Sequence, residues 1–302
     1  MSGVTVTIDP HVHSDDSYDG HEPIELILEH AAEIGLDAVV ITDHDVIGES
    51  KRAAEIASEY GLIGIPGVEV STAHGHLLAV GVERMPPRRR PYDETIEWIH
   101  DQGGVAIVPH PFQRSRHGVR QRNIPVPDSP DAAENATDIA AAETAAESDP
   151  GLDQSLIEVD AIEVFNAWLF TGYRNRRARR FAAEYGYPGI AASDAHDLAY
   201  VGRAFTELTI DGRDSVDEVT ADDVLNAIRE GTTRVNGKRA PVPMAAKHYV
   251  VAAARKSGYY AKTGATRTAT GTRWAIAELL STARVAAFQG AHRAARVLSW
   301  MR

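Results

Sequence analysis

The feature that most constrains the fold of this chain is an alternation of short apolar runs with longer amphipathic stretches over its first 230 residues. The runs rich in β-branched residues are expected strands, the last being the weakest candidate: 4–8, 38–42, 62–68, 77–82, 105–108, 160–164, 189–192 and 205–210. Stretches with helical spacing lie between several of them: 23–34, 47–60, 93–101 and 173–185. Alternation of this length predicts βαβ units and a mainly parallel sheet, and this many units favour a barrel.

Two segments depart from this alternation, and both are marked by their charge. Residues 128–154 are rich in Ala, Asp and Glu and contain no Lys or Arg, which predicts a mobile acidic insertion or, alternatively, one short helix. Residues 231–302 hold 13 Lys and Arg against one acid, a net charge of +12 that leaves −24 on the first 230 residues. This asymmetry indicates an acidic catalytic body followed by a basic tail.

Several classes of protein are excluded by what the chain lacks. With no cysteine, it has no disulfide, no thiolate metal site and no cysteine nucleophile. No apolar run reaches the length of a membrane span, and the first residues lack the pattern of a secretory signal, so we expect a cytoplasmic protein. The glycine-rich phosphate loop of ATPases and the G-x-S-x-G elbow of serine hydrolases are also absent.

Side chains that commonly bind metals follow nearly every expected strand. Barrel enzymes place their catalytic groups at the carboxyl ends of strands, so this recurrence indicates one shared site rather than unrelated structural residues. The donors are imidazoles and carboxylates, which suit Zn²⁺, Mn²⁺ or Fe²⁺, and they are too many for one ion. In chain order these residues are His11, His13, Asp43, His44, Glu69, His76, His110, Glu163, Asn166, Asp194 and His196.

Five short motifs give the chain a resemblance to a known family. They are HVHSDDSYDG at 11–20, ITDHD at 41–45, GVEVS at 67–71, HPF at 110–112 and SDAH at 193–196. In this order they resemble the polymerase-and-histidinol-phosphatase (PHP) family, over about residues 4 to 231. The resemblance implies an α/β fold, a distorted seven-stranded (β/α)7 TIM-like barrel, over residues 1–236. Residues 237–302 would then form a basic helical extension, with helix candidates at 244–256 and 273–300.

The resemblance also implies a role for each metal ligand in a site for two or three divalent ions of manganese, iron or zinc. His74 is a rival to one ligand and His21 a weaker rival to another, while Glu163 replaces a cysteine ligand of some members or is a buried structural carboxylate. The implied ligands are His11, His13 and Asp194 for the first ion, Glu69 as a bridge, His76 and His110 for the second, and Asp19, His44 and His196 for the third.

Residues that contact a phosphorylated substrate are expected outside this ligand set. Arg114 and His117 follow the HPF motif, and Arg203 follows the SDAH motif; each is a candidate for phosphate binding, with a solvated loop or a surface ion pair as the alternative. His117 is also a candidate general acid, beside Glu69 and Asp194 as catalytic residues. The arginines of the helix at 173–185 are expected to form a solvated face.

The resemblance predicts a metal-dependent phosphoesterase that hydrolyses a phosphate monoester, with a nucleotide or nucleoside bisphosphate as substrate and a metal-activated hydroxide as nucleophile. One alternative is an exonuclease acting on RNA or DNA ends. Another is a non-catalytic nucleic-acid-binding PHP protein, with the basic tail as a nucleic-acid contact; the nearly complete ligand set argues against it. Hydrolysis of C–N bonds is disfavoured because no Lys stands at the end of an expected strand before the tail.

Overall fold

The computed structural model describes residues 3–113, 117–126, 158–168 and 172–239. Arg114, the acidic insertion at 128–154 and the two helix candidates of the tail lie outside the described residues. Within the described part of the chain, no helix is both long and apolar enough to cross a membrane.

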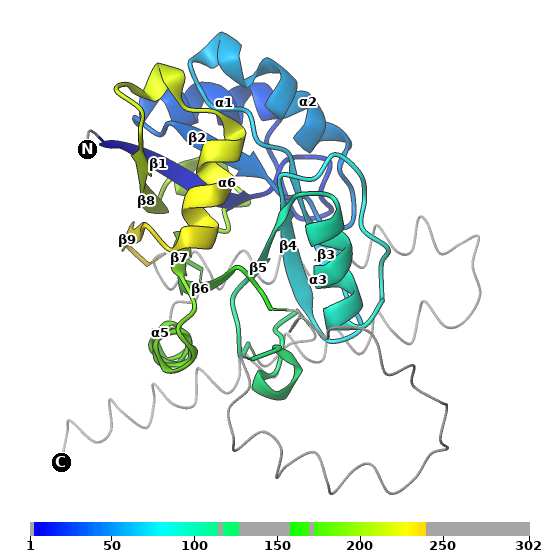
Figure 1. Ribbon diagram of the computed structural model, residues 1–302. Helices are drawn as coiled ribbons and strands as arrows, with labels where there is room; N and C mark the ends of the chain where they lie inside the picture. Colours follow the sequence, from blue (N-terminus) through cyan, green and yellow to red (C-terminus); the bar gives the residue numbers. More distant parts are fainter. Residues whose placement is uncertain (1–2, 114–116, 127–157, 169–171, 240–302) are drawn as a thin grey trace, which may run out of the picture.

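Two β-sheets form the centre of the molecule (Figure 1). In the first sheet the strand order is β2 (Ala38–Ile41), β1 (Gly3–Val12), β8 (Ala204–Asp211), β9 (Thr233–Gly237). In the second the order is β3 (Gly67–Ser71), β4 (His76–Val80), β5 (Val105–Val108), β6 (Ala161–Asn166), β7 (Gly189–Ala192). The α/β class expected from the sequence is therefore confirmed, whereas the described strands form two sheets rather than one closed barrel.

Strand direction also differs from the mainly parallel arrangement that the sequence predicts. The pairs β1–β2, β5–β6 and β6–β7 are parallel, and the pairs β1–β8, β8–β9, β3–β4 and β4–β5 are antiparallel. The reason at β3–β4 is the length of the connection. The chain turns between Ser71 and His76, where the Thr72 N–H donates to the carbonyl of Gly75. Four residues are too few for the crossover that a parallel pair requires.

The two sheets meet at the carboxyl ends of their strands. Isolated parallel bridges join Val12 to Ala195 and His44 to Glu69. At the first bridge the N–H of His13 donates to the carbonyl of Ala195, with a nitrogen–oxygen distance of 2.8 Å. These bridges bring the end of β1, the middle of β3 and the residues that follow β2 and β7 to one place, where the ligand-type side chains are expected.

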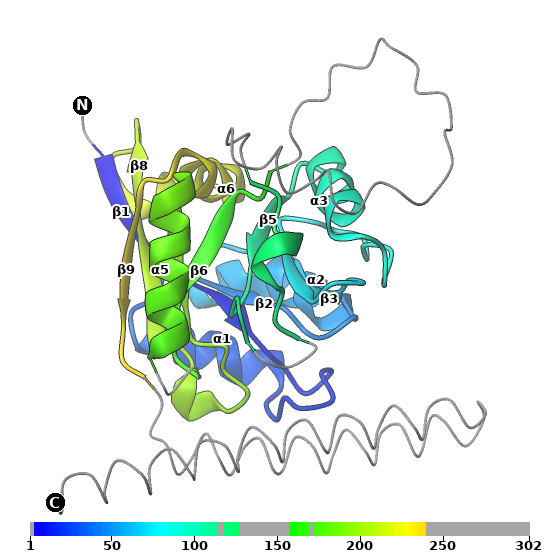
Figure 2. The same cartoon turned by 90° about the horizontal axis from the view of Figure 1, so that it is seen from below.

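Helices pack around the outside of the sheets (Figures 1 and 2). They are α1 (Ile24–Glu33), α2 (Gly48–Ile56), α3 (Tyr92–Asp101), α5 (Tyr173–Tyr185) and α6 (Ala221–Glu230), with 3₁₀ turns η1 (Ala57–Tyr60), η2 (Gln121–Asn123), η3 (Leu198–Tyr200) and η4 (Val216–Glu218). One apolar cluster lies between the two sheets and includes Ile8, Val40, Leu78 and Ile107. Further clusters lie between the sheets and the helices, α1 and α2 covering β1 and β2.

Most expected elements are present, with local shifts. The helix expected at 47–60 is α2 followed by η1, and the strand expected at 62–68 begins only at Gly67 as β3. Pro66 precedes this strand and has no N–H to donate to a ladder, which accounts for the late start. Neither α6 nor β9 was among the expected elements. The pairing of β9 with β8 continues as far as Gly237, so the first sheet extends one residue past the domain boundary expected at residue 236.

Candidate metal centre

The structure brings nine of the ten expected metal ligands together. They form four overlapping sets, in each of which one donor atom per residue lies within 4.8 Å of the others. Glu163, the tenth expected ligand, belongs to none of these sets. The sets are His13, Asp19, His44 and His196; His11, Glu69 and His110; His11, His13 and Asp194; and His44, Glu69 and His76.

Glu69, fully buried on β3, lies at the centre of the cluster. Its two oxygens face five imidazole nitrogens. Two ligands of one tetrahedral ion, each about 2.1 Å from it, would lie about 3.4 Å apart, and the contacts of Oε2 with His11 and His13 match this separation. Oε1 lies 2.6 Å from Nδ1 of His76 and 2.9 Å from Nε2 of His110, and Oε2 lies 2.9 Å from Nδ1 of His44, 3.4 Å from Nε2 of His11 and 3.5 Å from Nε2 of His13.

His11 and His13 leave β1 on the same side, as alternate residues of a strand do. Their Nε2 atoms are 3.1 Å apart, and each lies 3.4 Å from Oδ1 of Asp194. Asp194 has a φ of 53°, a left-handed conformation that is uncommon outside glycine and is often found at functional sites. The three donors converge on one point, as three ligands of a single ion would.

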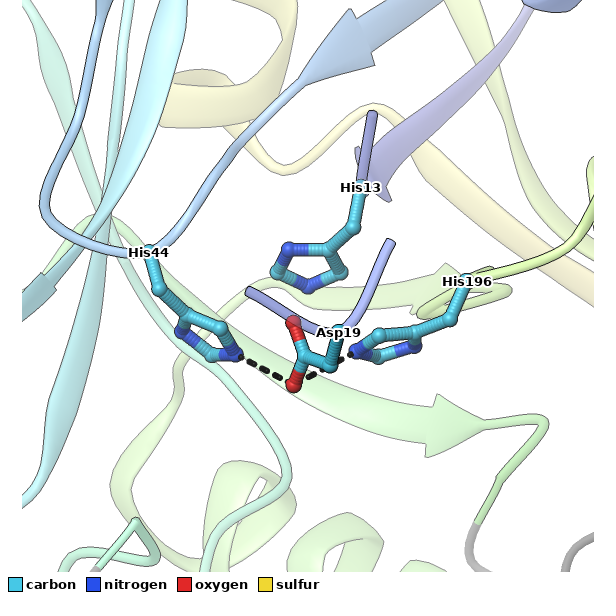
Figure 3. Close-up of side chains that lie close together, drawn as sticks. All are labelled: His13, Asp19, His44 and His196. Carbon is cyan, nitrogen blue, oxygen red and sulfur yellow. Dashed lines mark ion pairs between the residues drawn. The ribbon is translucent and has the colours of Figure 1, made fainter. Parts of the chain in front are cut away.

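A third group lies beside the first two (Figure 3). Oδ2 of Asp19 is 3.3 Å from Nε2 of His44 and 3.4 Å from Nε2 of His196, and the imidazole of His13 stacks on that of His196 with ring centroids 4.2 Å apart. The Ser17 hydroxyl donates to Oδ1 of Asp19, which leaves Oδ2 directed at the two imidazoles. Asp19 therefore belongs to this group, whereas its rival His21 belongs to none of the four sets found among the described residues.

The ionisable groups of the cluster shift one another's pKa values. Burial alone would raise the pKa of Glu69, but the surrounding imidazoles outweigh it and hold that pKa well below its ordinary value. Burial would lower the pKa of His44, yet Glu69 and Asp19 raise it to about 10. Burial prevails at His13 and His76, whose pKa values fall to about 3 and about 4. The surrounding imidazoles therefore favour the ionised form of Glu69.

Several buried donor atoms are left without a hydrogen bond by the protein. Oε2 of Glu69 and Nδ1 of His44 are 2.9 Å apart, but not in hydrogen-bonding geometry, and Nδ1 of His13 and of His110 also have no partner. The facing lone pairs of Glu69 and His44 would be satisfied by a cation. Imidazole and carboxylate donors without thiolate fit divalent ions of the Zn²⁺, Mn²⁺ or Fe²⁺ type, so the residues present fit a metal centre with more than one ion.

Two carboxylates near the cluster have positions that the sequence does not reveal. Glu163 lies behind His11, with Oε1 3.1 Å from Nδ1 of that ring. Asp43 accepts two hydrogen bonds from Ser14, one from its N–H at 2.7 Å and one from its hydroxyl at 2.5 Å. Burial raises the pKa of Asp43 to about 7, despite those bonds. Asp43 therefore joins the residues that follow β1 to those that follow β2.

Of the residues expected to contact substrate, His117 lies beside the ligand cluster, whereas Arg203 contacts other residues. The His117 ring lies 4.4 Å from that of His76, and its carbonyl accepts the N–H of His76, so it adjoins the ligand cluster. The Arg203 guanidinium donates to the carbonyl of Arg239 and lies 5.9 Å from the ring of Tyr200. None of these contacts of Arg203 is with a ligand-type residue.

Two residues of the site were not singled out in the sequence. Asp9 is fully buried on β1, accepts the N–H groups of Ser193 and Gly202, and has a pKa that burial raises to about 6. In the sequence, Asp9 is an acid that directly follows the apolar run at 4–8. The Tyr18 ring stacks on His44 with centroids 4.8 Å apart, a contact that depends on how the loop closes and has no sequence signal.

Comparison with known proteins agrees with the geometry of the site. The family model described as PHP domain matches residues 9–124, and the one described as PHP-associated matches residues 172–233. An uncharacterised protein of Methanocaldococcus jannaschii is 35% identical over 86 residues, covering 28% of this chain and 50% of that protein. The phosphoribosyl 1,2-cyclic phosphate 1,2-diphosphodiesterase of Eggerthella lenta is 35% identical over 85 residues, covering 26% of this chain and 32% of that enzyme.

A solved structure supports the same fold. A two-domain protein from Bacteroides vulgatus, which contains a predicted PHP-like metal-dependent phosphoesterase, superposes with a TM-score of 0.55 at 19% identity, covering 78% of this chain and 66% of that one. The chain spans half the length or less of the two curated relatives named above. Since the two family matches together contain the nine residues that converge at the metal centre, the chain belongs to the PHP family.

Proposed function

We propose that this protein is a metal-dependent phosphoesterase that acts at the cluster centred on Glu69. The observation that carries the proposal is the position of that carboxylate, whose two oxygens face five imidazole nitrogens within 3.5 Å. When bound, adjacent divalent ions neutralise phosphoryl oxygens and make water a nucleophile at neutral pH. The family match adds to this inference, because PHP proteins include metal-dependent phosphoesterases.

Different groups of residues would hold the different ions. His11, His13 and Asp194 offer one set of donors, and His76 and His110 offer a second on the other oxygen of Glu69. Asp19, His44 and His196 would hold a third ion, on the side where His13 stacks on His196 (Figure 3). Because most of these side chains are buried, the carboxylate charges act in a low dielectric, which strengthens their attraction for cations.

The finer proposal is a small phosphate monoester, such as a nucleotide or nucleoside bisphosphate. The ring of His117 adjoins His76 at the second group of donors, which supports a contact of His117 with such a substrate. A protonated His117 would donate a proton to the leaving oxygen. Arg114 and Arg203 remain proposed phosphate contacts from their positions in the sequence.

A phosphodiester is the second candidate substrate. It is favoured by the 85-residue match to an enzyme whose name describes a cyclic-phosphate diesterase. The same chemistry would also serve an exonuclease on RNA or DNA ends. Monoesterase and diesterase activities differ in their need for a free terminal phosphate, so a substrate panel separates them.

The test is a screen of metal-stripped protein reloaded with Mn²⁺. Phosphomonoesters, nucleoside bisphosphates, cyclic phosphates and short oligonucleotides are offered, and phosphate or cleaved product is measured. We expect one of these classes to be hydrolysed only after metal is added, with Glu69→Gln inactive and the half-buried Glu207→Gln on β8 unaffected. Protein that binds no ion and hydrolyses none of these esters would refute the proposal.

A further inference from the structure

Two polar side chains on β6, Glu163 and Asn166, contact residues of the metal centre from behind. We call this pair the β6 clamp. Both residues are fully buried. Between them they contact His11 on β1, His110 after β5 and Asp194 after β7, so one strand touches three ligands that come from three other strands.

The backbone of β6 accounts for how both side chains reach the same site. Residues three apart on a regular strand point to opposite faces of the sheet. In the pairing of β6 with β7, however, Glu163 lies opposite Ile190 and Phe165 lies opposite Ala191, so β6 has one extra residue. Such a bulge resets the alternation, which allows Glu163 and Asn166 to face the same cluster.

Glu163 uses both of its oxygens on protein donors. Oε1 lies 3.1 Å from Nδ1 of His11, and Oε2 accepts the N–H of His110 and the side-chain amide of Asn166. The opposite nitrogen of His11, Nε2, is the one that faces Glu69 and Asp194. Glu163 is thus separated from the ligand atoms by the His11 ring itself.

Asn166 occupies one of the two carboxylate oxygens of Asp194, as Glu163 occupies one of the two ring nitrogens of His11. Its amide nitrogen donates to Oε2 of Glu163 at 2.9 Å and to Oδ2 of Asp194 at 3.0 Å. The N–H of Trp168 donates to the Asn166 side-chain oxygen, which fixes the orientation of the amide. Oδ2 of Asp194 is therefore held by the protein, while Oδ1 remains directed at His11 and His13.

The clamp is itself held by a helix. Asn175 of α5, which is also buried, donates from its side chain to the carbonyl of Asn166 at 3.0 Å and accepts the N–H of Asn166 at 3.3 Å. The carboxyl end of β6 is consequently fixed against α5, and the side chains of the clamp have a rigid support.

We propose that Glu163 and Asn166 are positioning residues rather than metal ligands. By accepting the Nδ1 proton of His11, Glu163 keeps the Nε2 lone pair free for an ion, and Asn166 keeps Oδ1 of Asp194 free for the same ion. This inference rests on the proposed function, because it assumes that the cluster holds ions. Of the two roles that the sequence left open for Glu163, it disfavours that of a ligand in place of a cysteine.

The test is metal binding by the full chain, measured by titration of metal-stripped protein with Co²⁺ and by the visible absorption of the saturated protein. In Glu163→Gln the amide cannot accept from both His11 and His110, so one of these contacts is lost. We expect the number of ions at saturation to stay the same and the affinity of the first ion to fall about 10- to 100-fold. Glu207→Gln on β8, whose carboxylate pairs with Arg234 of β9, should bind as the wild type does.

Asn166→Ser provides a second test should Glu163→Gln not fold, because a serine hydroxyl can donate to only one of the two carboxylates. Loss of an entire ion from saturated Glu163→Gln, with a changed Co²⁺ spectrum, would make Glu163 a ligand and overturn the clamp. Unchanged affinity in folded variants would overturn it as well. Wild-type protein that binds no Co²⁺ would refute the proposed function together with the clamp, whereas the preceding outcomes refute the clamp alone.

Discussion

Glu69 contacts more of the metal centre than any other single residue of the described chain, and its replacement tests the bridging role. Glu69→Gln removes one negative charge from between the donor groups, and an amide cannot bind two cations through both of its end atoms. We expect turnover of the best substrate to fall by several orders of magnitude while circular dichroism shows a folded protein. Asp194→Asn should behave similarly, and Glu163→Gln should lose less. Near-normal turnover in Glu69→Gln would remove this residue from the mechanism.

The contact between Ser14 and Asp43 supports the site without touching an ion. Ser14→Ala leaves the buried Asp43 carboxylate with one hydrogen bond fewer. We expect the free energy of unfolding to decrease by about 1–3 kcal/mol, measured by urea denaturation, because a buried acceptor loses its partner. Ser58→Ala, on the exposed surface of η1, is the matched control and should change stability little. An equal effect in both variants would contradict the structural role of the contact.

Single residues of the site could be predicted from the sequence to different depths. His11, His13 and Asp194 were predictable because residues at strand exits converge when the strands share an edge. The role of Glu163 was not, because a carboxylate on a strand is the same residue type whether it contacts an ion or the back of an imidazole. The bulge in β6 decides between these roles, and it depends on pairing with β7.

Among the elements, α6 has the best-defined start, and its capping gives a pH-dependent prediction. The Thr220 hydroxyl accepts the N–H of Asp223, and the Asp223 carboxylate accepts the N–H of Thr220 and two bonds from Arg213. Hydrogen bonds from Arg213, followed by the N–H of Thr220, lower the pKa of Asp223 to about 2. A carboxyl whose pKa is lower in the folded state stabilises the fold above its unfolded pKa, and this stabilisation is lost as the pH falls towards 2.

Asp223→Asn should therefore lower the free energy of unfolding at neutral pH by about 1 kcal/mol, the usual effect of losing a cap. The difference from the wild type should shrink between pH 4 and pH 2, where the wild-type carboxyl becomes protonated. Urea unfolding at several pH values measures this, with the exposed Asp222→Asn on the same turn as control. A difference that does not depend on pH would show that the ionised carboxylate contributes nothing to the cap.

The elements themselves were more predictable than their pairing. Periodicity is a local property, and it identified seven strands close to their observed positions, including β5 and β7 with the same bounds. Pairing is a property of distant segments. The antiparallel β3–β4 hairpin follows from a turn of four residues, and the division into two sheets follows from β8 and β9 joining β1. No local pattern in the sequence specifies that association.

At the scale of the whole molecule, the metal centre joins both sheets, so ion binding should stabilise the entire fold. Its expected ligands come from β1, β3 and β4 and from the segments after β1, β2, β5 and β7. A ligand that binds only the folded state at 100 times its dissociation constant adds about 2.7 kcal/mol. We expect the melting temperature to rise when Mn²⁺ is added to metal-stripped protein and to fall again with chelator. Mg²⁺-free buffer with excess Ca²⁺, an ion that prefers all-oxygen sites, is the control and should give a smaller shift.

The basic tail provides the last prediction, which concerns charge rather than structure. Residues 240–302 hold 10 Lys and Arg and one acid, so their removal changes the net charge of the chain from −12 to −21. The cut belongs after Arg239, because β9 extends to Gly237 and is part of the first sheet. None of the nine converging ligands comes from the tail, so turnover of a small phosphate ester per folded molecule should survive the deletion.

If the tail contacts nucleic acid, oligonucleotide binding by the full chain should weaken by about 10³-fold or more between 50 and 200 mM salt for six phosphate contacts, and the truncated chain should lose that binding. Fluorescence anisotropy with a labelled 20-mer measures both. Binding that is absent from the full chain, or that survives truncation with the same salt dependence, would refute the nucleic-acid role of the tail and favour its packing against the acidic body.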